Sequence, residues 1–114
     1  MFLEGVTVDL DGEQVAKTTW VPDGYALYPA YPNPFIPGTT IQYEIVEKAD
    51  MGISIYNILG KEVKSLFNGV QDPGTWVVKW DEYDQTGKIV SPGIYFCRLD
   101  VGYTVLTRKM IFLK

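Results

Sequence analysis

The sequence contains no histidine, a single cysteine and hardly any pattern typical of a helix. Without an imidazole, the chain lacks the commonest general base, a frequent metal ligand and the central member of a Ser-His-Asp triad. One thiol cannot form an internal disulfide, and the apolar surroundings of Cys97 indicate a small buried hydrophobic residue. No segment approaches the roughly 20 apolar residues of a membrane helix. The start, Met1–Gly5, lacks the basic and long apolar parts of a signal peptide, so we expect none in these residues.

Positive charge is also scarce and unevenly distributed along the chain. The 114 residues carry a net charge of −4. Residues 1–30 hold five acidic side chains and one lysine, whereas residues 98–114 hold four basic side chains and one aspartate. Nucleic-acid binding needs a dense basic surface, so we expect no such partner. The basic C-terminal end is typical of an edge strand that lysine and arginine protect from aggregation.

What the sequence does contain is a period of two. Ile41, Tyr43 and Ile45 alternate with polar residues, and similar runs recur further along the chain. Turn signals rich in glycine, proline and asparagine separate the runs about every ten residues. The pattern predicts an all-β fold, an Ig-like antiparallel β-sandwich of about seven strands. Trp76 and Trp80 lie at alternate positions of one run and are expected to point inward.

The first residues follow a different pattern. Residues 6–10 alternate into Asp11–Gly12, which is a strong hairpin signal. The proline-rich segment 28–38 favours extended backbone that leads into the first sandwich strand. We therefore expect an N-terminal extension or hairpin over residues 1–27, either added to the sandwich or left from a preceding domain. The main domain is expected over residues 28–114.

Three acidic residues gather at one turn, at Asp81, Glu82 and Asp84. A glycosidase pair needs two carboxyl groups held several ångströms apart across a sugar-sized cleft. Three acids within four residues are better explained as a solvated turn with Asx-type hydrogen bonds. Calcium prefers oxygen ligands of this kind, but neither this turn nor Asp9–Glu13 has EF-hand spacing. We expect no catalytic residue, no cofactor and no resident metal, and leave an incidental calcium site open.

Aromatic side chains offer an alternative function. Exposed rings could form a carbohydrate platform, whereas a sandwich commonly uses tryptophan and tyrosine to fill its core and seal its ends. The candidate rings are Trp20, Tyr25, Tyr28, Tyr31, Tyr83 and Tyr103. A carbohydrate-binding or spacer domain of a secreted hydrolase therefore stays open as an alternative.

Several short motifs follow one another in a specific order along residues 28–114. They are Tyr31-Pro-Asn-Pro-Phe35 with Thr39–Tyr43, Ile53–Val63 with its Leu-Gly-Lys turn, Trp80-Asp81 with Asp84–Gly87 and Val90–Tyr95, and the closing segments Tyr95–Leu99 and Thr107–Lys114. In this order they resemble the C-terminal sorting domains of type IX secretion, which are related to the Ig-like domain of the flagellar hook-capping protein. Residues 1–27 have no counterpart in that pattern. Glu82 stands where relatives often have glycine, which predicts a different type of turn.

The resemblance and the local chemistry give most motif residues a structural role. Pro32, Asn33 and Pro34 are expected to fix the direction of the entry segment. Gly60 is expected to adopt a positive φ, and Gly93 to permit a close backbone approach. The full set of expected structural residues is Pro32, Asn33, Pro34, Gly60, Lys61, Val63, Trp80, Asp81, Gly93, Tyr95 and Leu99.

The same resemblance implies a non-enzymatic C-terminal module of a larger exported bacterial protein. The module would act as a sorting signal for outer-membrane secretion machinery, with a cargo domain upstream. It would pass through the periplasm to the outer-membrane surface or the extracellular medium. The expected recognition residues are Arg108, Lys109, Met110, Ile111, Phe112, Leu113 and Lys114.

We expect the last strand to close the sandwich through its inward residues. Arg108, Lys109 and the terminal carboxylate would then remain outside to be recognised. An edge strand with free backbone groups suits strand addition to a partner sheet, and an edge-strand dimer stays open. An assembly scaffold like the hook-capping relative is the other alternative.

Overall fold

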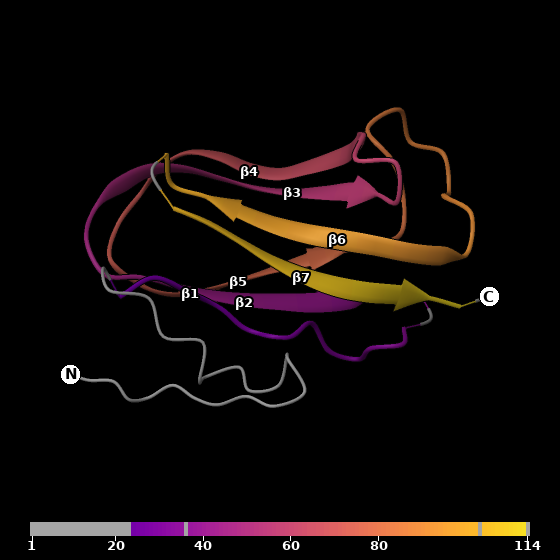
Figure 1. Ribbon diagram of the computed structural model, residues 1–114, viewed down its shortest axis with the longest axis horizontal. Helices are drawn as coiled ribbons and strands as arrows, with labels where there is room; N and C mark the ends of the chain where they lie inside the picture. The colour runs from indigo at the N-terminus through magenta and orange to yellow at the C-terminus, as the bar shows by residue number, and fades with distance from the viewer. Residues whose placement is uncertain (1–23, 36, 103, 114) are drawn as a thin grey trace.

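The computed structural model describes residues 24–35, 37–102 and 104–113, which form a sandwich of two antiparallel sheets (Figure 1). The strands are β1 (Ala26–Leu27), β2 (Thr39–Ile45), β3 (Ala49–Asn57), β4 (Glu62–Gln71), β5 (Gly74–Trp80), β6 (Gly93–Asp100) and β7 (Val105–Phe112). One sheet has the order β1-β2-β5 and the other the order β4-β3-β6-β7. The predicted all-β sandwich of about seven strands is confirmed. The predicted hairpin at Asp11–Gly12, and also Trp20, Tyr103 and Lys114, lie outside the described residues.

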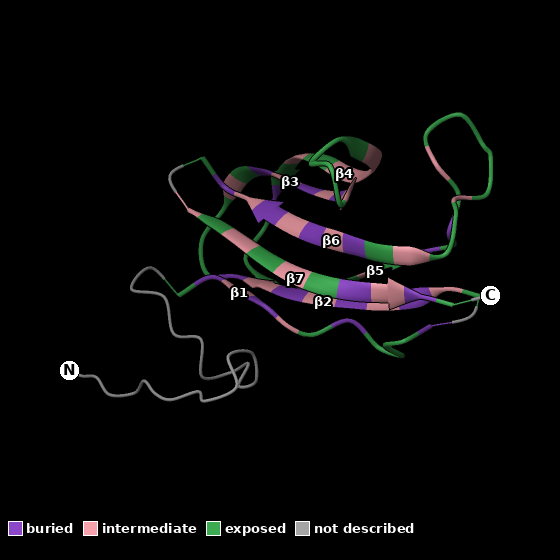
Figure 2. Cartoon of the chain, turned by 45° about the vertical axis from the view of Figure 1, so that its right-hand side comes forward, coloured by how far each residue is buried: buried purple, intermediate pink, exposed green. Residues whose placement is uncertain are grey.

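The period of two in the sequence becomes the core of the sandwich. Ile41, Tyr43 and Ile45 of β2 are each 1% exposed, and the intervening residues of β2 are only partly buried. Figure 2 shows the resulting alternation of buried and more exposed positions along the strands. Burying an aliphatic or aromatic side chain of this size contributes roughly 1.5–3 kcal/mol. The hydroxyl of Tyr43 donates to Oε1 of Gln71 at 2.7 Å, so its polar end is satisfied inside the core.

Both tryptophans of β5 point inward, as their spacing predicted. Trp80 is 1% exposed, and Trp76 is partly buried against the core cluster. The difference arises because β5 is the last strand in its sheet order, so an inward side chain near its start is covered from one side only. The core thus extends to the open flank between β4 and β5 without being sealed there.

The reason expected for Gly93 is wrong. A Cβ atom at this position would meet nothing within 4 Å, so no close approach requires glycine. Gly93 instead has a φ of +149°, a conformation that residues with a side chain rarely adopt. Gly60 has a φ of +83°, which confirms the positive value expected for its turn.

The turn after β5 also differs from expectation at Glu82. This residue is 8% exposed, and its neighbours in the turn, Asp81 and Asp84, are not buried. Its φ of +63° lies in the left-handed region that glycine adopts without cost. A glutamate therefore occupies the backbone conformation expected of the glycine found in relatives, and the Val90 amide donates to its carbonyl oxygen at 3.0 Å.

We predict that Glu82→Gly stabilises the protein. A left-handed conformation costs a residue with a Cβ roughly 1–2 kcal/mol, so removing it should raise the free energy of unfolding by about 1 kcal/mol in urea titrations. Asp81→Gly is the matched control, and it should lower stability because the Asp81 carboxylate accepts a hydrogen bond from the Tyr83 amide at 3.2 Å. A less stable Glu82→Gly protein would contradict the account of this turn.

Cys97 provides a test of how well the core excludes solvent. Its side chain is 0% exposed, and burial raises the pKa of the thiol to about 12. We predict that a thiol reagent at pH 8 labels the native protein only as fast as the protein unfolds, and labels it at once in urea. Since the native state holds this proton more tightly, stability should fall as pH rises from about 9 toward about 12. Fast labelling of the folded protein would contradict a closed core.

Candidate recognition site at the C-terminal strand

The last strand, β7, contributes alternate residues to the core. β7 is the outer strand of the four-stranded sheet and pairs antiparallel with β6. Met110 and Phe112 are 0% and 2% exposed, whereas Lys109 is exposed and Leu113 is 45% exposed. The expected recognition residues are therefore divided between the interior and the surface, and Lys114 lies outside the described residues.

Arg108 is not outside the sandwich, which corrects the expected position of its side chain. It lies opposite Cys97 in the β6–β7 register, and residues opposite one another share a face of the sheet. Its Nε atom donates to the carbonyl oxygen of Leu27 in β1 at 2.7 Å. Arg108 therefore joins the two sheets at the β1 side of the sandwich, and a charged donor makes this a strong hydrogen bond.

The entry segment binds the outer edge of β7 through the side chain of Asn33. Nδ2 of Asn33 donates to the carbonyl oxygen of Lys109 at 3.1 Å, and Oδ1 accepts from the Ile111 amide at 2.9 Å. An asparagine side chain carries the same donor and acceptor as a peptide group. Asn33 therefore acts as one residue of an extra strand, and the entry segment runs beside the end of β7 (Figure 1).

The backbone of Phe35 continues this pairing. Its amide donates to the Ile111 carbonyl oxygen at 2.9 Å, and its carbonyl oxygen accepts from the Leu113 amide at 3.1 Å. The peptide bonds before Pro32 and Pro34 are both cis, and the Pro32 carbonyl oxygen accepts from the Thr39 hydroxyl at 2.8 Å. The three motif residues Pro32, Asn33 and Pro34 thus set the path of the entry segment, as the sequence predicted.

This pairing changes the expectation of a free edge. From Lys109 to Leu113, backbone groups on the outer side of β7 are already bonded to residues 33–35. A partner strand could add along this stretch only by displacing the entry segment. Strand addition at the C-terminal half of β7 is therefore disfavoured in the folded domain.

Four aromatic rings from four motifs meet behind β7. The Phe35 ring stacks on Phe112 with 5.2 Å between centroids and lies 5.6 Å from Trp80. Trp80 in turn meets the edge of Tyr95 at 5.3 Å. Its indole nitrogen donates to the Tyr83 carbonyl oxygen at 3.0 Å, and the Tyr95 hydroxyl donates to the Ser91 carbonyl oxygen. Aromatic pairs of this geometry contribute about 0.5–1.5 kcal/mol beyond their burial.

The remaining motif residues take the structural places expected of them. Leu99 is 0% exposed in the core, and Val63 packs against the core cluster from β4. Gly60 and Lys61 complete the turn between β3 and β4, where the Lys61 amide donates to Oδ1 of Asn57 at 3.0 Å. The sequence did not identify Asn57 as the residue that organises this turn.

The acidic turn uses its carboxylates for local hydrogen bonds. Oδ1 of Asp84 accepts from the Thr86 hydroxyl, the Thr86 amide and the Lys88 amide. The Thr86 hydroxyl, followed by the Lys88 amide, lowers the pKa of Asp84 below its ordinary value. These contacts confirm the Asx-type interpretation for Asp81 and Asp84, whereas Glu82 is buried rather than solvated.

Neither a metal cluster nor a spanning helix is found among the described residues. No group of three or more cysteine, aspartate or glutamate side chains in residues 24–35, 37–102 and 104–113 could hold a metal ion. In the same part of the chain, no helix is long and apolar enough to cross a membrane. The Asp9–Glu13 segment lies outside the described residues.

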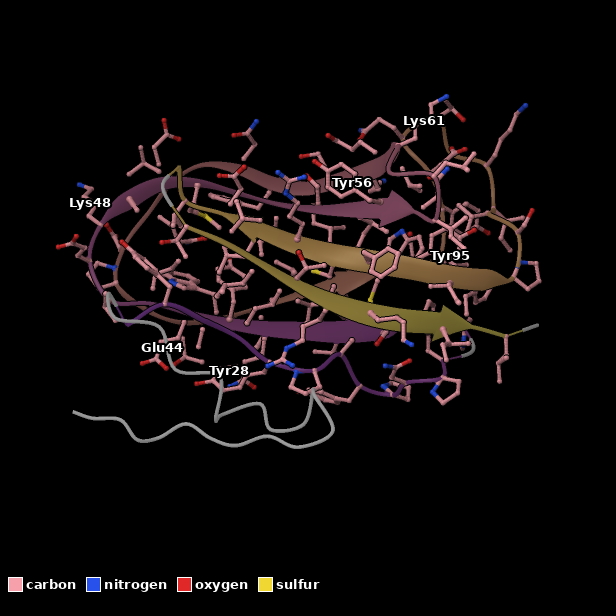
Figure 3. The ribbon with its side chains drawn as sticks, in the orientation of Figure 1. Tyr28, Glu44, Lys48, Tyr56, Lys61 and Tyr95 are labelled. Carbon is pink, nitrogen blue, oxygen red and sulfur yellow. The ribbon has the colours of Figure 1, made fainter. Side chains whose placement is uncertain are left out.

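The candidate carbohydrate rings do not form one surface. Tyr25 is 1% exposed and belongs to the core, whereas Tyr31 and Tyr83 are 53% and 40% exposed. Tyr28 is partly buried, and its hydroxyl donates to Oε1 of Glu44 at 3.0 Å (Figure 3). Tyr28 and Tyr31 lie on the entry side, whereas Tyr83 lies in the turn after β5. Trp20 and Tyr103 fall outside the described residues.

The fold and this site define a small β-sandwich module whose last strand is fixed by its own entry segment. A family described as "Secretion system C-terminal sorting domain" has a model that matches residues 29–113. The chain belongs to this family, and the resemblance identified from the motifs is confirmed. Membership marks the chain as part of an exported protein that reaches the cell surface or the medium. A sorting domain is a signal rather than a catalyst.

Comparison with individual proteins adds support for the fold. No curated protein matches the chain. Among solved structures, the chain is similar to one entitled "Crystal structure of dimeric latent PorU from Porphyromonas gingivalis", with a TM-score of 0.60 and 20% identity. The match covers 83% of this chain and 10% of the PorU chain. At this identity the similarity concerns the fold alone.

We predict that Asn33→Ala loosens β7 and lowers the free energy of unfolding by about 1–2 kcal/mol. It removes two hydrogen bonds to the backbone, each with a net contribution of about 0.5–1.5 kcal/mol. Urea denaturation measures the loss. Asn68→Ala, at an exposed position on β4, is the matched control and should change stability by less than about 0.5 kcal/mol. Equal effects of the two substitutions would contradict the role of Asn33.

Proposed function

We propose that residues 28–114 are a type IX sorting signal, recognised as a folded domain by protein contacts with outer-membrane secretion machinery. Membership of the sorting-domain family over residues 29–113 carries this proposal. Residues 1–27 would be the extension that connects the domain to an upstream cargo domain. The parent protein would cross the periplasm before it reaches the cell surface or the medium.

The division of β7 between core and surface narrows the proposed recognition residues. Met110 and Phe112 support the fold from inside, and Arg108 bonds to Leu27 across the sandwich. Lys109 and Leu113 present their side chains to solvent beside the Asn33 clamp. We therefore assign contact with the machinery to these two side chains, and a positioning role to the other described residues of the set.

Deleting the end of the chain is a poor test of recognition, because it removes Met110 and Phe112 from the core. Each such loss costs roughly 2–5 kcal/mol, so the domain would unfold whether or not the end is recognised. Point substitutions at exposed positions separate the two effects, since surface changes usually alter stability by no more than about 0.5 kcal/mol.

We predict that a reporter fused upstream of residues 28–114 reaches the cell surface in a bacterium that has this secretion system. The combined variant Lys109→Glu and Leu113→Ser should keep its melting temperature and leave the reporter in the periplasm. Thr107→Glu changes another exposed side chain of β7 and should be exported normally. Normal export of the double variant would contradict the site assignment, and a wild-type reporter that stays in the periplasm would contradict the proposed function.

A further inference from the structure

The turn between β3 and β4 presents two aliphatic side chains to solvent. Ile58 is 68% exposed and Leu59 is 87% exposed, the highest values for large apolar residues in the described part of the chain. Single exposed apolar residues are common on protein surfaces. Two adjacent ones at the tip of a turn form a continuous apolar projection, which we call the turn tip. Turns of this kind favour polar residues and glycine, so the turn tip needs another explanation.

The shape of this turn does not depend on the two exposed side chains. Oδ1 of Asn57 accepts from the amides of Leu59 and Lys61 at 2.9 and 3.0 Å. The Asn57 amide donates to the Lys61 carbonyl oxygen, and the Gly60 amide donates to the Asn57 carbonyl oxygen. Backbone groups and one asparagine thus fix the turn. The turn tip is held in place before any partner arrives, which reduces the entropy lost on binding.

A cleft of about 450 Å³ lies beside the turn tip, between this turn and the loop 84–91. Val63, Val90 and Tyr95 contribute apolar surface to it, and Ile89 at its side is 45% exposed. The loop is held against β4, because the Gln85 amide donates to the Val63 carbonyl oxygen and Oε1 of Gln85 accepts from the Ser65 amide. Projection and cleft therefore form one rigid surface.

The rim of this surface has a preferred sign of charge for a partner. Lys61 and Lys88 line the cleft and are exposed, and the ion pair recorded in the described residues joins Arg98 to Asp100 instead. Figure 3 shows Lys61 at this end of the sandwich and Lys48 at the opposite end. Glu62 also lines the cleft, whereas the Asp84 carboxylate is occupied by its own turn. Two available ammonium groups favour acidic side chains opposite them.

We propose that the turn tip inserts into an apolar pocket with an acidic rim on a protein of the secretion machinery. The inference rests on the proposed function and gives it a second contact besides Lys109 and Leu113. A protein fits better than a lipid surface for two reasons. Glu62 lies beside the tip, and the tip has no aromatic residue of the kind that anchors proteins at bilayer interfaces. A few buried apolar anchors commonly dominate a protein interface.

The experiment uses the exported reporter fused to residues 28–114 and the combined variant Ile58→Ser and Leu59→Ser. Export should fall at least tenfold, which corresponds to about 1.4 kcal/mol of binding, while the melting temperature of the purified domain stays unchanged. Val70→Ser with Val77→Ser is the matched control, because these residues are 60% and 52% exposed on β4 and β5. It should leave export at the wild-type level. Lys61→Glu should reduce export, and Lys48→Glu should not.

Each outcome decides between distinct explanations. Export of the wild type together with normal export of the turn-tip variant overturns this inference alone. Failure of the wild type to be exported overturns the proposed function, and the inference falls with it. Sedimentation of the purified wild-type domain with anionic phospholipid vesicles, lost in the turn-tip variant, would overturn the protein partner in favour of a membrane surface.

Discussion

The contact between Phe35 and the last strand is the interaction on which the rest of this structure depends. Phe35 stacks on Phe112 and meets Trp80, while its backbone exchanges hydrogen bonds with Ile111 and Leu113. One residue near the start of the described chain therefore holds the end of it by both its ring and its peptide groups. Asn33 adds two further hydrogen bonds to the same edge.

This contact explains why motifs distant in the sequence belong to one family pattern. The entry segment, the end of β5, the start of β6 and the end of β7 contribute Phe35, Trp80, Tyr95 and Phe112 to one continuous set of rings. Loss of any one ring would leave a cavity against the other three, at a cost of several kcal/mol. Folding of the sandwich and placement of its C-terminal strand are consequently the same event, which suits a signal that is recognised only when folded.

Local patterns in the sequence predicted the parts of the fold that local physics decides. Alternation identified the inward faces of β2 and β5, and the positive φ of Gly60 followed from turn chemistry. The clamp could not be predicted in this way, because Asn33 bonds to residues 76 and 78 positions away. An asparagine between two prolines was the available signal, since it supplies a peptide-like donor and acceptor where proline supplies no amide.

The errors have the same origin. Arg108 was expected outside because arginine usually is, yet its place in the β7 register directs it inward, where the Leu27 carbonyl oxygen accepts its hydrogen bond. Glu82 occupies a left-handed conformation that sequence rules reserve for glycine, because the surrounding turn fixes the backbone there. In both cases tertiary contacts prevailed over the average behaviour of the residue type.

Amide hydrogen exchange of the unmodified protein tests the central claim most directly. Ile111 and Leu113 lie at the outer edge and end of β7, where amides of an unpaired edge would exchange as fast as those of exposed loops. Because Asn33 and Phe35 accept their hydrogen bonds, both amides should instead be protected to nearly the same extent as the amide of the fully buried Ile53. Exchange at the rate of the exposed Gly87 amide would contradict the claim that the entry segment holds the C-terminal strand.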